Sequence, residues 1–222
     1  MKRNKTSKDW IRRHLTDPYV RRARDEGYRS RAAFKLLEIA RRDKLLQPGM
    51  VVVDLGAAPG GWTQAAAAAV GPGGRVIAID RVEMAPLPGV TFIRGDVREP
   101  GVLAELASIL AGRPVDLVLS DMVPNLTGVK VVDQARGIAL AELALEVAVN
   151  WLKPEGAFLV KVFHGGGFEP FTARMRQSFR TLNVRKPKAS RESSSEVYLL
   201  GRVPKHEFPI GTGTAFHATN PL

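Results

Sequence analysis

Short apolar runs alternate with amphipathic stretches along most of this chain, from about residue 49 onward. Seven of the runs are rich in Val, Ile and Leu and have the length of buried strands, while the segments between several of them place apolar residues at helical spacing. The pattern predicts strands at 51–54, 75–80, 90–94, 116–120, 157–162, 182–185 and 196–201, and helices at 61–70, 101–111, 134–152 and 168–178. Such alternation is typical of one α/β domain with a Rossmann-like, seven-stranded, mostly parallel sheet and helices on both faces.

The first part of the chain is helical rather than alternating. Residues 1–48 contain two stretches of helical periodicity, at about 7–26 and 30–43, and Ser30 is expected to be the N-cap of the second. A Gln-Pro-Gly sequence then marks the start of the main domain, expected at 49–202. We therefore interpret the first 48 residues as a basic helical appendage of the same domain.

The last part of the chain differs again. A polar loop separates the final two predicted strands and is too short for a crossover helix, so the last strands should pair antiparallel. Residues 203–222 are rich in Pro and Gly and lack periodicity. We expect this tail to be irregular.

The most informative stretch is the turn after the first strand, at residues 51–62. An apolar run ends in the acid Asp54, and a turn containing Gly56 and Gly60 then opens the next helix. Glycine lets the backbone approach a ligand with no Cβ in the way, which is typical of a nucleotide-type cofactor site. The spacing G-x-x-x-G-G differs from the dinucleotide fingerprint G-x-G-x-x-G and argues against NAD as the cofactor.

The charge of the chain is positive and concentrated in two segments. There are 33 Lys and Arg residues against 22 Asp and Glu, a net charge of +11. Residues 1–48 hold 15 basic and 6 acidic residues, and residues 174–191, which include Arg185 and Lys186, hold seven basic residues and no acid. Either segment alone is most simply a solvated surface. If the fold brings them to one face, they form a phosphate-binding surface beside the cofactor.

Composition also narrows the class of protein. The chain has no cysteine, which excludes disulfides, thiolate metal sites and cysteine nucleophiles, and its four histidines are widely scattered, so no metal site is expected. We find neither a signal peptide nor an apolar run of membrane-spanning length. We therefore expect a cytoplasmic protein with no membrane contact.

The turn D-L-G-A-A-P-G-G-W resembles the S-adenosylmethionine site of the FtsJ/RrmJ family of RNA ribose 2′-O-methyltransferases. Other motifs of that family follow in the same order: G-Y-R-S-R-A-A-F-K-L at 27–36, L-S-D-M-V-P-N at 119–125, V-K-V-F at 160–163 and S-E-V-Y at 195–198. The resemblance leaves out only the first few residues and the tail. It implies the S-adenosylmethionine-dependent methyltransferase fold, S-adenosylmethionine as the cofactor and RNA as the partner.

Cofactor contacts are expected where the parallel strands end, because open α/β sheets bind ligands there. Asp80 ends the second strand and can accept both ribose hydroxyls of an adenosine. Asp54 either caps loop amides or organises the turn, and Trp62 either walls the pocket or packs in the core. The resemblance adds Asp96 as an acceptor for the adenine amino group. The expected cofactor set is Asp54, Gly56, Gly60, Trp62, Asp80, Asp96 and Asp121.

The resembling family uses a Lys-Asp-Lys-Glu catalytic set, which occurs here as Lys35, Asp121, Lys161 and Glu196. Lys161 is the most informative of these, since it interrupts the apolar run F-L-V-K-V-F, where a buried charge is costly without a partner. It would act on a ribose hydroxyl either as a neutral base or as a charged group that orients it. Without the resemblance, Lys35 would be interpreted as a solvated helix charge. Glu196 is either an acid that positions the substrate or an edge-strand charge that discourages aggregation.

The interpretation that follows is methylation of a ribose 2′-hydroxyl in RNA. Within the family, the compact chain looks most like the bacterial enzyme that methylates a uridine of 23S ribosomal RNA, so the large ribosomal subunit is the expected partner and a monomer the expected state. A tRNA anticodon-loop enzyme is the alternative. Two other classes fit less well: a non-catalytic ribosome-assembly factor would not need the intact site residues, and a small-molecule methyltransferase would not need the two basic segments.

Overall fold

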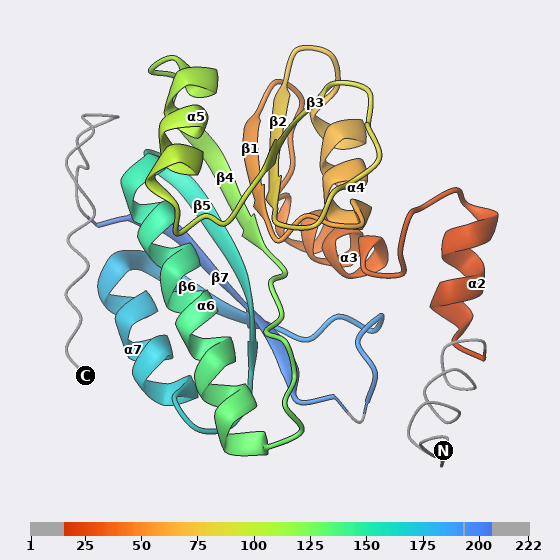
Figure 1. Cartoon of the computed structure of the whole chain (residues 1–222), viewed down its shortest axis with the longest axis vertical. Helices are drawn as coiled ribbons and strands as arrows, with labels where there is room; N and C mark the ends of the chain where they lie inside the picture. Colours follow the sequence, from red (N-terminus) through yellow and green to blue (C-terminus); the bar gives the residue numbers. More distant parts are fainter. Residues whose placement is uncertain (1–15, 193, 206–222) are drawn as a thin grey trace.

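A single seven-stranded sheet forms the centre of the computed structural model, which describes residues 16–192 and 194–205 (Figure 1). Its strand order is β3-β2-β1-β4-β5-β7-β6. The strands are β1 (Val51–Leu55), β2 (Arg75–Asp80), β3 (Val90–Arg94), β4 (Val115–Ser120), β5 (Leu152–Phe163), β6 (Phe179–Arg185) and β7 (Glu196–Pro204). The first five are parallel, and β7 runs antiparallel to both of its neighbours, β5 and β6.

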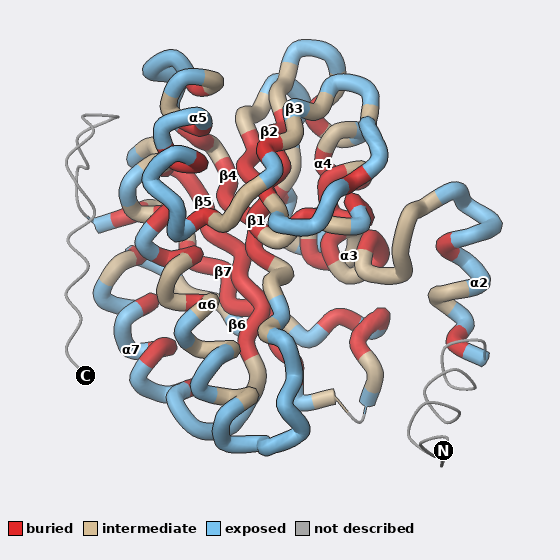
Figure 2. The backbone as a smooth tube through the Cα atoms, in the orientation of Figure 1, coloured by how far each residue is buried: buried red, intermediate tan, exposed pale blue. Residues whose placement is uncertain are grey.

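Helices cover both faces of this sheet, so that its central strands are buried on both sides, whereas the edge strands β3 and β6 are partly exposed (Figures 1 and 2). The helices are α2 (Pro18–Asp25), α3 (Ala33–Asp43), α4 (Gly61–Val70), α5 (Pro100–Leu110), α6 (Lys130–Trp151) and α7 (Phe168–Ser178). Apolar residues of α5, α6 and α7 form the core on one face, and those of α3 and α4 form the core on the other. Within β1, Val53 packs into the first core and Val52 into the second, as the period of a strand requires.

The predicted fold class is confirmed, and so is the antiparallel pairing of the last strands. Strands β2 and β3 and helices α4 and α7 have the predicted bounds, whereas β5 begins at Leu152 rather than at residue 157. Residues 7–15 of the first predicted helix and the tail after Lys205 lie outside the described residues. The division into appendage, domain and tail stays a prediction.

The prediction that Ser30 caps the second N-terminal helix is wrong. Helix α3 begins at Ala33, its N-cap is Ala32, and no side chain caps it. Ser30 instead lies against the start of α4, since a Cβ added to Gly61 would come within 2.2 Å of the Ser30 hydroxyl oxygen. The chain turns once more before the helix begins, and the serine is used in packing.

The two basic segments meet through acidic residues of the first segment. Arg185 of β6 donates from Nη2 and Nε to both carboxylate oxygens of Asp43, at the end of α3, at 2.6 and 2.8 Å. This bidentate contact holds the pKa of Asp43 below its ordinary value. The Glu38 carboxylate accepts from the Lys188 amide, and Asp17 pairs with Arg191. Part of the second basic segment therefore holds α3 in place.

We expect Arg185→Ala to lower the free energy of unfolding by about 2–3 kcal/mol, because it leaves the mostly buried Asp43 carboxylate without its partner. Arg180→Ala, at an exposed position of the same strand, is the control and should change it by less than about 0.5 kcal/mol. Urea denaturation measures both.

The pH dependence of the free energy of unfolding gives a second check on the Arg185–Asp43 pair. Because the folded pKa of Asp43 lies below 3.8, the stabilisation is present above that pH and disappears as Asp43 becomes protonated at lower pH. Equal stabilities of Arg185→Ala and Arg180→Ala at neutral pH would mean that Arg185 does not hold α3.

Candidate active site

The strand order reverses between β1 and β4, and the candidate site lies outside the carboxyl ends of these strands. Chain connections run from β1 to β2 on one side, while β4 continues to β5 on the other, which is the point where open sheets bind ligands. The loops after β1 and β4 approach each other closely. A Cβ added to Gly56, whose φ is +75°, would lie 2.5 Å from Cγ of Met122. Glycine is required there by the packing of these two loops as well as by the turn.

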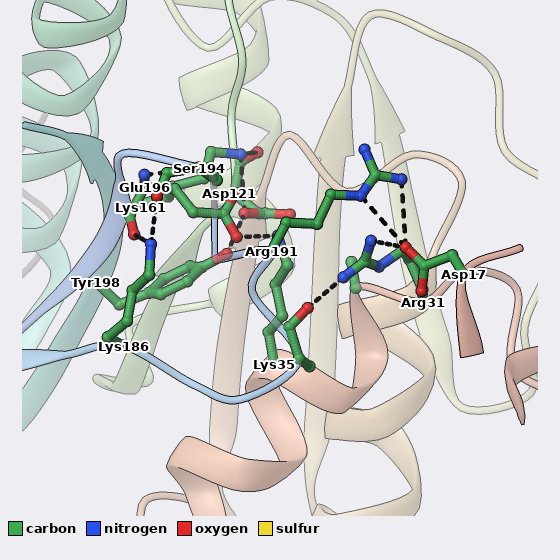
Figure 3. Close-up of polar contacts among 12 residues, drawn as sticks. Asp17, Arg31, Lys35, Asp121, Lys161, Lys186, Arg191, Ser194, Glu196 and Tyr198 are labelled. Carbon is green, nitrogen blue, oxygen red and sulfur yellow. Dashed lines mark hydrogen bonds and ion pairs between the residues drawn. The ribbon is translucent and has the colours of Figure 1, made fainter. Parts of the chain in front are cut away.

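Lys161 of β5 is bound by Asp121, which follows β4 (Figure 3). The lysine Nζ donates to the Asp121 carboxylate oxygen Oδ1 at 2.8 Å and to the Asp121 carbonyl oxygen at 2.6 Å. The Lys161 side chain is only 4% exposed, whereas that of Asp121 is 20% exposed. A buried ammonium group is thus held at the site by a partly open carboxylate, which is the partner that its burial requires.

Lys35 of α3 pairs with Glu196 of β7 beside this first pair. The Lys35 Nζ lies 2.6 Å from Oε1 of Glu196, and both side chains are 12% exposed. Burial raises the pKa of Glu196, but the charge and hydrogen bond of Lys35 and the charge of Lys161 outweigh burial and leave it below its ordinary value. Glu196 is therefore ionised at neutral pH. The four predicted catalytic residues lie together as two ion pairs, one between residues of the middle of the chain and one between residues near its two ends.

Tyr198 is a member of this group that sequence reasoning missed. Its hydroxyl donates to the same Asp121 Oδ1 at 3.2 Å, and its ring lies under Lys35, with Nζ 5.9 Å from the ring centroid. Burial and the nearby Asp121 charge raise the Tyr198 pKa well above its ordinary value, so the hydroxyl keeps its proton. The available signal was the strand period, because Tyr198 lies two residues after Glu196 and so faces the same side.

The arrangement offers two cations and an ionised acid at the opening of the cofactor turn. Lys161 can donate to or accept a proton from a hydroxyl group, and Lys35 can bind an anion beside it. Nearby, Arg31 pairs with Asp17 and Lys186 donates to the Glu196 carbonyl at 2.7 Å (Figure 3). Such a group fits proton transfer or methyl transfer at a hydroxyl on a polyanionic substrate.

The predicted cofactor residues fall into two groups. Asp80 lies at the end of β2, and its oxygens accept the Val82 amide at 2.8 Å and the Ala58 amide at 2.9 Å, which ties the glycine turn to β2. Asp54 is fully buried, and Thr63 donates to its Oδ2 at 2.6 Å while Oδ1 has no partner among the described atoms. Asp54 therefore links β1 to the first turn of α4 within the core, and so holds the two ends of the glycine turn.

The other predicted cofactor residues have partners of their own. Asp96 accepts two contacts from the Arg98 side chain, at 2.5 and 2.9 Å, which hold its pKa at about 2. Trp62 is 3% exposed, donates to the Ala32 carbonyl and packs against Tyr198 with ring centroids 5.6 Å apart. The structure thus places Trp62 in the core beneath α3. Gly60 has φ +104°, and a Cβ there would lie 2.7 Å from Sδ of Met84.

In residues 16–192 and 194–205, no group of three or more His, Cys, Asp and Glu side chains is placed to hold a metal ion. Over the same part of the chain, no helix is both long and apolar enough to cross a membrane.

Known proteins that are similar to this chain are methyltransferases. The model of the FtsJ-like methyltransferase family matches residues 28–203. A relative from Azoarcus sp. strain BH72, named ribosomal RNA large subunit methyltransferase E, is 63% identical over 201 residues, which cover 90% of this chain and 98% of the relative. A relative of the same name from Thiobacillus denitrificans is 57% identical over 215 residues, which cover 96% of this chain and 98% of the relative. A crystal structure of a protein assigned as a ribosomal RNA methyltransferase from Plasmodium falciparum superposes with a TM-score of 0.71 at 26% identity, over 80% of this chain and 98% of that one.

The buried Asp54 gives the site a pH-dependent stability. Burial raises its pKa from 3.8 to about 7, so the folded state keeps a proton that the unfolded chain has already released. The free energy of unfolding therefore falls as the pH rises across this range. Asp54→Asn abolishes the titration, and we expect it to gain about 2–3 kcal/mol relative to the wild type between about pH 5 and pH 8 in urea denaturation.

Glu105→Gln, at an exposed position of α5, is the matched control and should follow the wild type at both pH values. If Asp54→Asn also follows the wild type, the Asp54 carboxyl ionises in the folded protein as it does in the unfolded chain, and its assignment as a buried neutral group is wrong.

Proposed function

Because this chain belongs to the FtsJ-like methyltransferase family, we propose that it transfers a methyl group from S-adenosylmethionine to a ribose 2′-hydroxyl of large-subunit ribosomal RNA, at a uridine of 23S RNA. The observation that carries this proposal is the buried Lys161–Asp121 pair, which lies at the opening of the glycine turn with Lys35 and Glu196 beside it. Relatives at 57–63% identity are named as ribosomal RNA enzymes, which favours ribosomal RNA over tRNA.

The chemistry of the turn fits this methyl donor. S-adenosylmethionine carries a sulfonium cation and a ribose diol, and when bound it supplies an electrophilic methyl group. Asp54, Asp80 and Asp121 lie at the carboxyl ends of the neighbouring strands β1, β2 and β4. They are close enough that the charges of Asp121 and Asp80 raise the pKa of Asp54, in addition to its burial. Each Asp80 oxygen accepts one backbone amide and has further acceptor capacity for a ribose hydroxyl. At Asp96, an adenine amino group would share the carboxylate with Arg98.

Lys161 is the residue we assign to the substrate hydroxyl. Two of its three possible N–H donors are directed at Asp121, which leaves one position to engage a 2′-hydroxyl. Asp121 fixes the lysine, and Tyr198 fixes Asp121 through its hydroxyl. Lys35 and Glu196 form the wall beside it and position the ribose. Two roles fit this geometry: Lys161 as the base that takes the proton, or as the cation that orients the hydroxyl and stabilises its developing negative charge.

The proposed RNA contacts follow from the charges around this group. Arg31 and Arg191 flank Asp17 near the two ion pairs (Figure 3). Lys188 is exposed on the loop that carries Arg191. Cations at these positions would bind the phosphates that adjoin the methylated ribose. Since the substrate is ribosomal RNA, we infer a cytoplasmic site of action, and one chain supplies all the proposed catalytic groups, as a monomer would.

We expect Lys161→Ala to reduce single-turnover methyl transfer by about 10²-fold or more, because it removes both possible roles of the amine. Lys161→Arg separates the two roles. Arginine keeps the charge but does not deprotonate in proteins, so it stays inactive if Lys161 is the base and recovers part of the rate if Lys161 only orients the hydroxyl. The substrate is large ribosomal subunits from cells lacking this protein, and the product is mapped as a 2′-O-methylated nucleotide.

Affinities for S-adenosylmethionine and for the subunits are measured in parallel, since a folding defect would mimic a loss of chemistry. Normal binding of both together with wild-type transfer by Lys161→Ala would remove Lys161 from the mechanism. Failure of the wild type to produce any 2′-O-methylated nucleotide would refute the proposed function.

Asp80→Ala should weaken S-adenosylmethionine binding by about 10- to 100-fold in titration calorimetry, through loss of charge-assisted hydrogen bonds to the ribose. Glu105→Ala removes an exposed acid of α5 and should leave the affinity unchanged. If both variants bind as the wild type does, Asp80 serves only to hold the turn through the Ala58 amide.

A further inference from the structure

The segment that follows Asp121 exposes an unusual number of aliphatic side chains. Among the described residues, seven large hydrophobic side chains are exposed, and five of them lie within ten residues. We use the name apolar loop for residues 123–132, which comprise the loop after Met122 and the first three residues of α6; its exposed members are Val123, Leu126, Val129, Val131 and Val132. Figure 2 shows a largely exposed stretch that leads from β4 into α6. Clustered exposure of this kind marks a binding surface more often than scattered surface residues do.

The apolar loop is held in its conformation by specific hydrogen bonds. Asp133 accepts from the Thr127 amide at 2.7 Å, the Thr127 hydroxyl at 2.8 Å and the Gly128 amide at 3.1 Å. These contacts, of which the Thr127 amide contributes most, lower the pKa of Asp133. The Thr127 hydroxyl oxygen in turn accepts the Val129 amide. The valines and the leucine are therefore presented to solvent by an organised loop.

The position of the loop makes it one wall of the catalytic group. It leaves the sheet directly after Asp121, and its first neighbour, Met122, packs against the glycine turn. At its far end, Gln134 contacts the carbonyl of His164 and the amide of Gly166, in the turn that follows the strand of Lys161. The loop therefore joins the carboxyl ends of the two strands that carry Asp121 and Lys161.

The opposite wall has a different character. It is formed by α3 with the turn before it, which provide Lys35 and Arg31, and by the β6–β7 loop with the start of β7, which provide Arg191 and Glu196 (Figure 3). One wall is thus charged and the other is aliphatic. A nucleotide is divided in the same way, because its phosphates are anionic while its base presents apolar faces. A ribose held at Lys161 with its phosphates toward the charged wall has its base toward the apolar loop.

We propose that the apolar loop binds the base of the nucleotide whose ribose is methylated, unstacked from its neighbours, with Leu126 and Val129 against its face. This inference rests on the proposed function, because it takes the ribose at Lys161 as its reference point. A base drawn out of its stack can bring its 2′-hydroxyl to a side chain as enclosed as Lys161, whereas a ribose inside a helix is less accessible. The loop would then determine which nucleotide reacts.

A photo-crosslink identifies the occupant of the loop directly. Leu126→p-benzoylphenylalanine places a photoreactive group at a side chain that is 71% exposed, and Val184→p-benzoylphenylalanine, 48% exposed on β6, is the control. The probe is large ribosomal subunits from cells lacking this protein. We expect the variant at residue 126 to crosslink to the methylated nucleotide or to its immediate neighbour, and the variant at residue 184 not to do so. A crosslink to a ribosomal protein, a crosslink to distant RNA, or no crosslink overturns the proposal.

Kinetics on the same subunits test whether the contact matters. We expect Leu126→Ser to lower kcat/KM for the subunits by about tenfold, because it removes the apolar surface of one leucine side chain from the contact with the base, with unchanged affinity for S-adenosylmethionine. Leu126→Phe should retain most of the activity because it keeps an apolar face, and Val184→Ser should match the wild type. An unchanged kcat/KM in Leu126→Ser contradicts the proposal.

Wild-type methylation, mapped in the same reactions, separates the two levels of inference. If the wild type forms a 2′-O-methylated nucleotide that does not crosslink to residue 126, the function stands and the role of the loop is wrong. If the wild type forms none, the proposed function has failed and this inference fails with it.

Discussion

The geometry of the site depends on one constraint: the buried ammonium group of Lys161 must have a polar partner next to it. Lys161 occupies β5 between apolar residues, and its side chain is almost fully buried. Asp121 meets the requirement with both its carboxylate and its carbonyl oxygen, and the register of β4 against β5 brings the two residues together. In the next pairing, Lys161 lies opposite Tyr198, which donates to the same carboxylate. Because a slip of one residue would turn these side chains to the other face, sheet register and active-site geometry are the same constraint.

Around this pair, segments that are far apart in the sequence contribute different groups: some supply charged side chains and others supply apolar ones. The N-terminal helices and the loop between β6 and β7 are tied together by Asp17, Glu38 and Asp43, and this joint structure supplies Lys35 and Glu196. The basic residues of this segment therefore divide between two roles: Arg185 holds α3 through Asp43, and Lys188 stays exposed. The exposed aliphatic side chains of the apolar loop follow Asp121 in the chain.

Much of this was predictable from the sequence, because the central strands are buried on both faces and their sequences are nearly continuous apolar runs. The bounds of β2 and β3, the glycine turn and the four charged residues of the catalytic group were predicted from runs, spacing and family resemblance. Three features were not, and each depends on tertiary contacts. Ser30 packs against Gly61 instead of capping α3, and Arg185, which sequence reasoning assigned to phosphate binding, is held by Asp43. The strand period places Tyr198 on the same face as Glu196, but its hydrogen bond to Asp121 depends on the pairing of separate strands.

The central claim is that Asp121 and Lys161 act as one unit in methyl transfer, and a double-mutant cycle on the single-turnover rate tests it most directly. Residues that form one unit show strongly non-additive losses, because removing either member already disables the other. Asp121→Ala, Lys161→Ala and the double variant are compared with the wild type at saturating S-adenosylmethionine and RNA. The account predicts that the double variant is no slower than the slower single variant. Losses that multiply in the double variant would contradict it, since the two residues would then contribute independently.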